Sequence, residues 1–498
     1  MSSERDSYKK IFKTTSIFGG IQIFNILVVI LKSKAIAILL GPAGLGIISI
    51  FNSTSSLIES STNLGVNVSA VKSIALSNKE EEKIHQSVLI AVVKKLVWVI
   101  GLIGFLLTII LSPWLSQISF HNDSYTFSFA LLGFSLLALH LNSGQIAILQ
   151  GLRRVKLIAY STLIGSIIGL LISIPMYYFF GTKGIVPAIV ATSIAAVLSS
   201  WYFLKRAQIT DIKVDFHTVK KEGKEIIRLG FLISLTSIFP ALAAYVVRLF
   251  ISNIGDLTDV GLYSAGFAIV GTYVGMVFSA MSTDYYPSLS EVSKDNNKCT
   301  EKVNQQILVS ILILVPILIA LIVFVKLGII ILYSAKFLGT VKMIQWAALG
   351  VFFQAFSWCI AFIFLAKGDS KVYFLNELIP NLYILIINCV SYYIWGLEGM
   401  GISYLIGYIL YFIQVYLVAK KRYGYQFDRF VFLNCTKHLG LLVLTFLIVY
   451  YFRPVVQYTA GSLLIAISIF FSIKTLEKKT NFLATIRDNS RNKNHLKD

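Results

Sequence analysis

Residues 304–330 read NQQILVSILILVPILIALIVFVKLGII, and no charged residue occurs between positions 307 and 325. A helix needs about 20 mostly apolar residues to cross a hydrocarbon core of ~30 Å. Similar runs recur along the 498-residue chain, which is 56% hydrophobic and 14% charged. Backbone amides have no partners in lipid, so such runs must be helices or strands of a closed barrel. Because the runs do not alternate polar and apolar residues, the sequence predicts an all-α polytopic membrane protein.

The apolar runs predict about fourteen transmembrane helices, separated by loops too short to form domains. We expect these helices over residues 12–40, 43–64, 88–115, 125–150, 157–180, 184–204, 225–254, 260–284, 304–330, 343–366, 371–395, 398–419, 432–452 and 455–475.

The basic residues predict the orientation. Cytoplasmic loops of membrane proteins are enriched in Lys and Arg. If the N-terminus is cytoplasmic, the predicted outer loops hold only four of the 44 Lys and Arg residues: Lys183, Lys336, Lys342 and Arg453. We therefore expect both termini in the cytoplasm. The same bias accounts for the net charge of +20 without a nucleic-acid partner.

A weak internal repeat predicts the domain organisation. Lys34 lies seven residues before Gly41, and Arg248 lies seven residues before Gly255. The helices that follow begin with related triplets, Leu45-Gly46-Ile47 and Val260-Gly261-Leu262. Six helices separate the two copies, which is typical of parallel repeats related by an axis along the membrane normal. The expected domains are an N-terminal six-helix lobe, a C-terminal six-helix lobe, two additional helices and a cytoplasmic tail, over 1–210, 211–425, 426–476 and 477–498.

Arg248 is the first candidate substrate-binding residue, because charge inside a membrane run is costly and usually functional. At about 100° per residue it shares a helix face with small and polar residues, namely Ser234, Ser237, Ala241 and Ala244. Such a face packs against protein or water rather than lipid. The alternative interpretation is that Arg248 extends to the outer headgroups.

The first predicted helix supplies the other candidates for binding substrate. Its polar stripe consists of Thr15, Gly19, Gln22, Asn25, Lys32 and Ser33. The stripe favours Lys32 as the partner of Arg248, whereas the repeat favours Lys34. We retain both lysines, with Asn25 and Gln22, as candidates; either lysine could instead extend outward to the headgroups.

Three acidic residues lie within or at the edge of predicted spans, and each could bind a coupling proton or cation: Glu59, Asp284 and Glu377. Neither the six histidines nor the four cysteines have metal-binding spacing. A nucleotide-binding glycine-rich loop is also lacking. The sequence therefore predicts no catalytic residues, no metal and no cofactor. A proton or sodium gradient, or the membrane potential, is the expected energy source.

Several short motifs, in this order and spacing, resemble the O-antigen translocase family. They are Gly41-Pro42-Ala43-Gly44-Leu45-Gly46, Gln150-Gly151-Leu152-Arg153, Tyr286-Pro287-Ser288-Leu289-Ser290, Ser334-Ala335-Lys336-Phe337, Leu365-Ala366-Lys367 and Tyr373-Phe374-Leu375-Asn376-Glu377. The resemblance covers roughly residues 8–422, and the superfamily also holds multidrug extruders and the peptidoglycan-precursor flippase. The chain departs from the pattern at Asn52, where a relative has a basic residue.

The resemblance implies two six-helix lobes, alternating access and a cationic cavity, to which Lys34 and Arg248 correspond. It implies an inner-membrane flippase of undecaprenyl-diphosphate-linked oligosaccharide for lipopolysaccharide or related polysaccharide biosynthesis. Membrane lipid and a polysaccharide polymerase complex are the other implied partners. The alternatives are a multidrug or cation antiporter of the same fold, and a membrane polysaccharide polymerase or ligase. Bases at the repeat-related positions argue against the antiporter, and short outer loops argue against the enzyme.

Overall fold

The computed structural model describes residues 24–77, 83–209, 212 and 214–480, and all regular secondary structure in these residues is helical. Ten helical segments in the described chain are long and apolar enough to cross a membrane. The predicted fold class, an all-α polytopic membrane protein, is therefore confirmed. Both termini lie outside the described residues, so their cytoplasmic location stays a prediction.

The described helices cover residues 24–39, α2 (Gly41–Thr62), α3 (Val66–Leu76), α4 (Lys83–Phe120), α5 (Thr126–Gly151), α6 (Val155–Phe180), α7 (Ile185–Lys205), α8 (Phe216–Ile254), α9 (Leu257–Ala268), α10 (Gly275–Glu291), α11 (Asn296–Leu332), α12 (Val341–Ala366), α13 (Ser370–Tyr423), α14 (Arg429–Tyr451) and α15 (Pro454–Thr480). A π-helical turn, Ile269–Val274, joins α9 to α10.

Two of the ten segments are long enough for two crossings each. Residues 155–205 and 371–423 contain 51 and 53 residues, or roughly 75–80 Å of helix. The first folds back at the short 3₁₀ turn Gly181–Gly184 between α6 and α7. The second changes direction inside α13 at Gly396, whose φ of 57° and ψ of −139° are not helical. Both breaks lie between predicted spans.

Two local features differ from the sequence prediction. The predicted loop after the second span contains the additional helix α3. The predicted helix over 260–284 ends before the observed one, because α10 continues through Pro287 to Glu291. Prolines are tolerated inside membrane helices where neighbouring groups satisfy the freed backbone. Tyr285 is buried, and its hydroxyl donates to the carbonyl of Cys359 at 2.7 Å.

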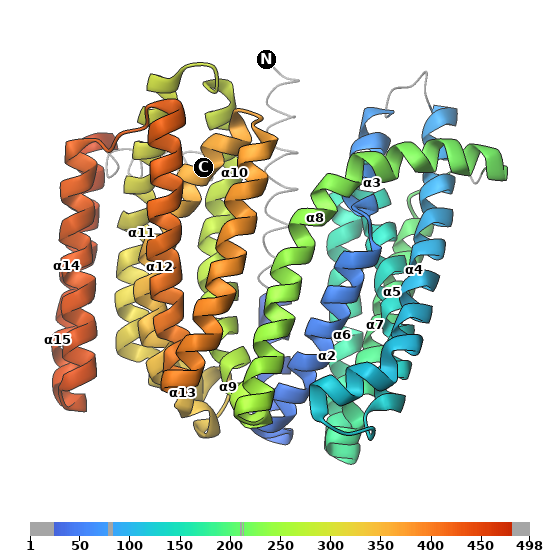
Figure 1. Ribbon diagram of the computed structural model, residues 1–498, viewed down its shortest axis with the longest axis horizontal. Helices are drawn as coiled ribbons and strands as arrows, with labels where there is room; N and C mark the ends of the chain where they lie inside the picture. Colours follow the sequence, from blue (N-terminus) through green and yellow to red (C-terminus); the bar gives the residue numbers. More distant parts are fainter. Residues whose placement is uncertain (1–23, 78–82, 210–211, 213, 481–498) are drawn as a thin grey trace, which may run out of the picture. The chain divides into compact units, whose positions relative to one another are not determined.

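The described chain forms two compact units. The first comprises Met1–Gly261 with Leu332–Lys336, and the second comprises Leu262–Ile331 with Phe337–Asp498. In unit 1, α8 packs against α2, α3 and α4 (Figure 1). The predicted lobe boundary after residue 210 assigned this helix to the second lobe, and the six-six-two division stays a prediction.

Helix α8 begins at Phe216, inside a stretch that the sequence prediction assigned to a loop. Its N-cap is Asp215, whose side chain accepts a hydrogen bond from the amide of Thr218 at 3.3 Å. The hydrogen bonds from Thr218 lower the pKa of this exposed carboxyl. In Figure 1 the first part of α8 runs across the ends of α3 and α4, and the remainder runs beside α2.

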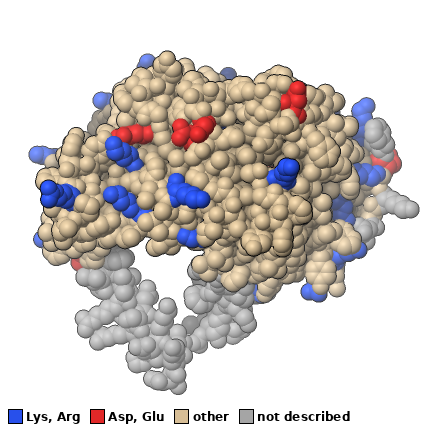
Figure 2. Space-filling model, turned by 90° about the horizontal axis from the view of Figure 1, so that it is seen from below, with Lys and Arg blue, Asp and Glu red and all other residues tan. Residues whose placement is uncertain are grey.

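The ends of the helices in Figure 2 carry few charged side chains. Isolated blue and red residues are separated by tan surface in this view from below. The turn between α6 and α7 lies at this lower end in Figure 1, and it is one of the predicted outer loops. The outer position of this end stays a prediction.

Unit 2 is built around α11, which contains the run quoted first, and α12. These two helices have the largest buried shares of the ten spans. Glu398 of α13 then ties α12 to α14: it accepts hydrogen bonds from Trp346 at 3.0 Å and Tyr450 at 2.9 Å and pairs with Lys342 at 3.2 Å. Helix α15 approaches α11 at Gly461, where an added Cβ would lie 2.6 Å from Val323. The last two helices are thus packed into unit 2.

Candidate functional site

Arg248 is half-buried in α8, and two hydrogen bonds orient its side chain. Its Nε donates to Oγ of the buried Ser49 in α2 at 2.6 Å. Its Nη1 donates to the carbonyl oxygen of Ala244, one turn earlier in the same helix, at 2.8 Å. The side chain therefore lies back along α8 toward the helix N-terminus. With that N-terminus at the predicted cytoplasmic side, the guanidinium points into the span, against the outward-extending alternative.

Part of the face of α8 that carries Arg248 is packed: Ser234 is buried, whereas Ser237 is exposed. Ser234, on the same face, donates to the carbonyl oxygen of Ser60 in α2 at 3.2 Å. Helix α8 also closely approaches the turn between α2 and α3. A Cβ on Gly230 would lie 2.5 Å from the carbonyl oxygen of Gly65, which itself has a φ of 68°. Helix α2 is thus the support on which the Arg248 side chain is held.

The structure places Lys32 in a different setting from Arg248. Lys32 lines a cavity of about 260 Å³ inside unit 1. Asn142 and four hydroxyl residues share this lining: Ser161, Thr162, Ser166 and Thr192. The lysine thus faces groups that can donate to and accept from a polar ligand. The role of Lys32 in binding substrate stays a prediction.

The other candidate residues of the first helix are Lys34, Asn25 and Gln22. Lys34 and Asn25 are half-buried, and Asn25 Oδ1 is a buried acceptor without a partner among the described residues. Gln22 lies outside the described residues. The association of either lysine with Arg248 stays a prediction.

Glu59 lies in a small polar cluster between α2 and α5. Ser143 is positioned to donate to Glu59 Oε1 at 3.4 Å, and Thr62 hydrogen-bonds to His140 Nε2 at 2.9 Å. His140 is only 2% exposed. The sequence analysis missed both α5 residues because His140 stands alone in an apolar run and Ser143 carries no charge. Their shared signal is spacing: residues 140 and 143 lie on one helix face.

In unit 2, Glu377 lies at a cavity of about 340 Å³ that is lined largely by aromatic residues. Tyr411 donates to Glu377 Oε1 at 2.9 Å. Gln354 of α12 donates to Tyr408 at 3.1 Å and accepts from Tyr404 at 3.0 Å. These three tyrosines were missed, although their i, i+4, i+7 spacing places them on one face of α13.

The three acidic candidates do not form one site. Glu59 belongs to unit 1, and Glu377 and Asp284 belong to unit 2. Asp284 is exposed, whereas Glu377 is half-buried. Within the described part of the chain, Glu377 has no ion-pair partner. No group of three or more potential metal ligands occurs among the described residues.

Polar and charged groups inside many apolar helices define a polytopic membrane protein with polar groups in its interior. A model of the family described as "Polysaccharide biosynthesis protein" matches residues 35–342, and the chain belongs to this family.

Two curated relatives match much of the chain. The "Putative O-antigen transporter" of Shigella flexneri is 25% identical over 296 residues, covering 58% of this chain and 68% of the relative. The "Lipid III flippase" of Escherichia coli (strain K12) is 20% identical over 406 residues, covering 79% of this chain and 95% of the relative. Both are named for transport rather than catalysis, as the sequence analysis expected of this chain.

A solved structure has the same fold. It is the lipid II flippase MurJ in an inward closed conformation, with a TM-score of 0.70 at 15% identity over 93% of this chain and 99% of that chain. At this identity the likeness establishes the fold alone.

Proposed function

We propose that the protein flips an undecaprenyl-diphosphate-linked oligosaccharide, an O-antigen or related repeat unit, from the cytoplasmic to the periplasmic leaflet. Alternating access moves the headgroup, and cationic side chains neutralise the diphosphate. Membership of the polysaccharide biosynthesis family and the names of the two relatives support this class of cargo. The fold does not separate a flippase from a multidrug extruder, since the resemblance places both in one superfamily.

The observation that carries the proposal is the guanidinium of Arg248 inside a membrane-spanning helix. A diphosphate is multiply negative, and a planar guanidinium offers it several donors in a fixed fork. Ser49 and the carbonyl of Ala244 occupy Nε and Nη1. They hold the group in one orientation, which lowers the entropy lost when the diphosphate binds.

The residues of the first helix have complementary roles in this proposal. Lys34 and Lys32 are the candidate second charges for the diphosphate. The polar cavity around Lys32, with Asn142, offers hydrogen bonds to sugar hydroxyls. Asn25 and Gln22 extend the same polar stripe. The polyprenyl tail stays in lipid.

The setting follows from the same proposal. We place the protein in the bacterial inner membrane with both termini in the cytoplasm, acting beside a polysaccharide polymerase. A gradient of protons or sodium supplies the energy, with Glu377, Glu59 and Asp284 as the candidate ion sites.

Purified protein in vesicles tests the proposed transport. The probe is a dye-labelled disaccharide on undecaprenyl diphosphate, and dithionite outside the vesicle bleaches the outward-facing dye. We expect protein vesicles to bleach the inner pool at least about tenfold faster than empty vesicles. Phosphatidylcholine with the same dye is the control and should stay protected. Equal rates for both lipids, or no flipping, would contradict the proposal.

Glu377→Gln tests the proposed coupling. The amide keeps an oxygen for the Tyr411 hydroxyl but does not bind or release a proton. We expect the rate driven by a proton or sodium gradient to fall about tenfold or more, with little change without a gradient. Glu291→Gln, an exposed carboxyl at the end of α10, is the matched control. If Glu377→Gln keeps the full response to the gradient, Glu377 does not couple transport to the ion.

A further inference from the structure

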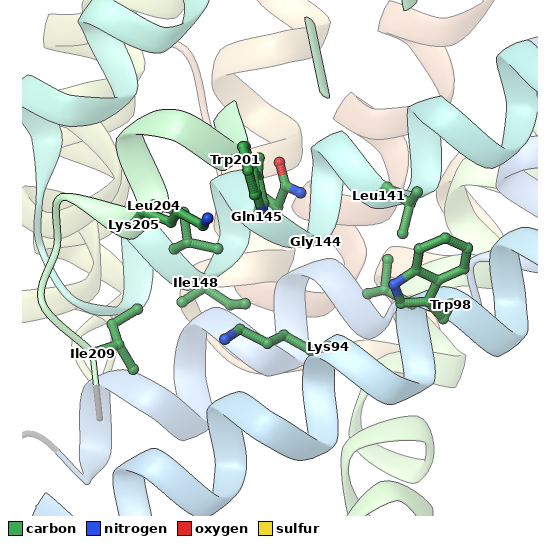
Figure 3. A pocket seen from close by; sticks show the side chains of 11 residues that line it. Lys94, Trp98, Leu141, Gly144, Gln145, Ile148, Trp201, Leu204, Lys205 and Ile209 are labelled. Atoms are coloured by element: carbon green, nitrogen blue, oxygen red, sulfur yellow. The ribbon is translucent and has the colours of Figure 1, made fainter. Parts of the chain in front are cut away.

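A pocket in unit 1 is lined by residues that the proposed transport does not use. It has a volume of about 310 Å³ and lies between α4, α5 and α7 (Figure 3). Helix α4 contributes Lys94 and Trp98, α5 contributes Gln145, and α7 contributes Trp201 and Lys205. This volume is large enough for a small polar headgroup.

The pocket is positively charged. Two of its eleven lining residues are lysines, and none is acidic. In Figure 3 the ammonium groups of Lys94 and Lys205 lie on either side of Ile148. Lys205 Nζ lies 3.7 Å from the centroid of the Trp201 ring. The Ser200 hydroxyl donates to Oε1 of the Gln145 side chain, so the amide nitrogen Nε2 of that side chain is the end available to an acceptor.

The rim of the pocket faces the membrane. Trp98 and Trp201 are 51% and 47% exposed although both lie in membrane-spanning helices. Trp and Lys together are typical of the membrane interface, where the ring contacts acyl chains and the ammonium contacts headgroups. In the predicted orientation this end of α7 is cytoplasmic. The cytoplasmic leaflet is rich in anionic lipid, and basic pockets between membrane helices bind such headgroups.

We propose that this pocket binds the anionic headgroup of a membrane phospholipid. Lys94 and Lys205 contact the phosphate, Gln145 donates to it, and the two tryptophans contact the glycerol and upper acyl chains. A bilayer phospholipid is the proposed occupant because anionic headgroups are abundant in the cytoplasmic leaflet, toward which this end of α7 is predicted to lie. This site is independent of Arg248 and does not depend on the proposed transport.

Tryptophan quenching in proteoliposomes tests the site. Brominated phosphatidylglycerol is titrated into phosphatidylcholine, and the signal of a Trp98→Phe/Trp201→Phe variant is subtracted as background. We expect quenching of the two pocket tryptophans to saturate at a low fraction of brominated lipid. Lys94→Ala/Lys205→Ala should shift that fraction upward by about tenfold or more. Lys220→Ala/Lys221→Ala removes two exposed lysines of α8 and should leave the curve unchanged.

A second measurement on the unmodified chain covers the case in which the lysine variant does not fold. Quenching by brominated phosphatidylglycerol should weaken in about 1 M salt, whereas quenching by brominated phosphatidylcholine should not. Equal quenching by the two lipids, or no response to either change, overturns the proposal. Displacement of the brominated lipid by undecaprenyl diphosphate at equal mole fraction would overturn it in favour of a cargo site.

Discussion

Arg248→Ala is expected to abolish most export of surface polysaccharide in cells that depend on this protein. Truncating one partner of a buried, hydrogen-bonded charge pair costs about 2–5 kcal/mol. Export should therefore fall by about 30-fold or more. Arg228→Ala, which removes an exposed arginine from the predicted cytoplasmic part of the same helix, should leave export close to normal. The measurement is the amount of full-length surface glycan at matched membrane levels of each variant.

Two further variants separate charge from geometry at this position. Arg248→Lys keeps the charge but loses the fork and the Nε bond to Ser49, so export should be intermediate. Ser49→Ala keeps the arginine but releases it, and its effect should be smaller than that of Arg248→Ala. Normal export by Arg248→Ala at normal abundance would show that the residue does not bind the cargo.

The sequence predicts the helices of this fold well, because the length and low polarity of an apolar run determine whether it forms a membrane-spanning helix. The run at 304–330 is recognisable by itself, and it lies within α11. The break at Gly396 also follows from local chemistry, since glycine accepts a positive φ without strain. Pro287 is the opposite case. Whether a proline ends a membrane helix depends on tertiary partners, which one sequence does not reveal.

The candidate site is only partly predictable for the same reason. A lone arginine in an apolar run can be recognised as a functional candidate from the sequence, because burying its charge in a membrane helix is costly. Its partner Ser49 is an ordinary serine in a helix that already contains several, and only the packing of α2 on α8 selects it. His140 and Ser143 depend on the packing of α5 against α2 in the same way.

A second large effect is expected at Gly46 and Gly261, the glycines of the repeated triplets, because the structure brings these two segments into close contact. A Cβ on Gly261 would lie 1.9 Å from the carbonyl oxygen of Pro42, and one on Gly46 would lie 2.0 Å from that of Leu257. Both obstacles are backbone atoms, which do not rotate away. Gly261→Ala should therefore force α2 and the start of α9 apart and lower the free energy of unfolding by about 1–3 kcal/mol.

Gly440→Ala in α14 is the matched control, since nothing lies within 4 Å of the added Cβ. Alanine there is expected to be neutral or to stabilise by up to about 1 kcal/mol, because it is the better helix former. Thermal unfolding of the purified variants gives the comparison. Equal melting temperatures for Gly261→Ala and Gly440→Ala would mean that the close crossing does not exist in solution.

The double variant Gly46→Ala/Gly261→Ala makes the test specific to that crossing. If both added methyl groups separate the same pair of backbones, the second causes little further displacement once the first has acted. The loss of unfolding free energy in the double variant should then be clearly smaller than the sum of the losses in the two single variants. Full additivity would indicate two independent defects. Because Arg248 is held by Ser49 of α2, the separation should also reduce export, and Ser49→Ala should have little further effect in that background.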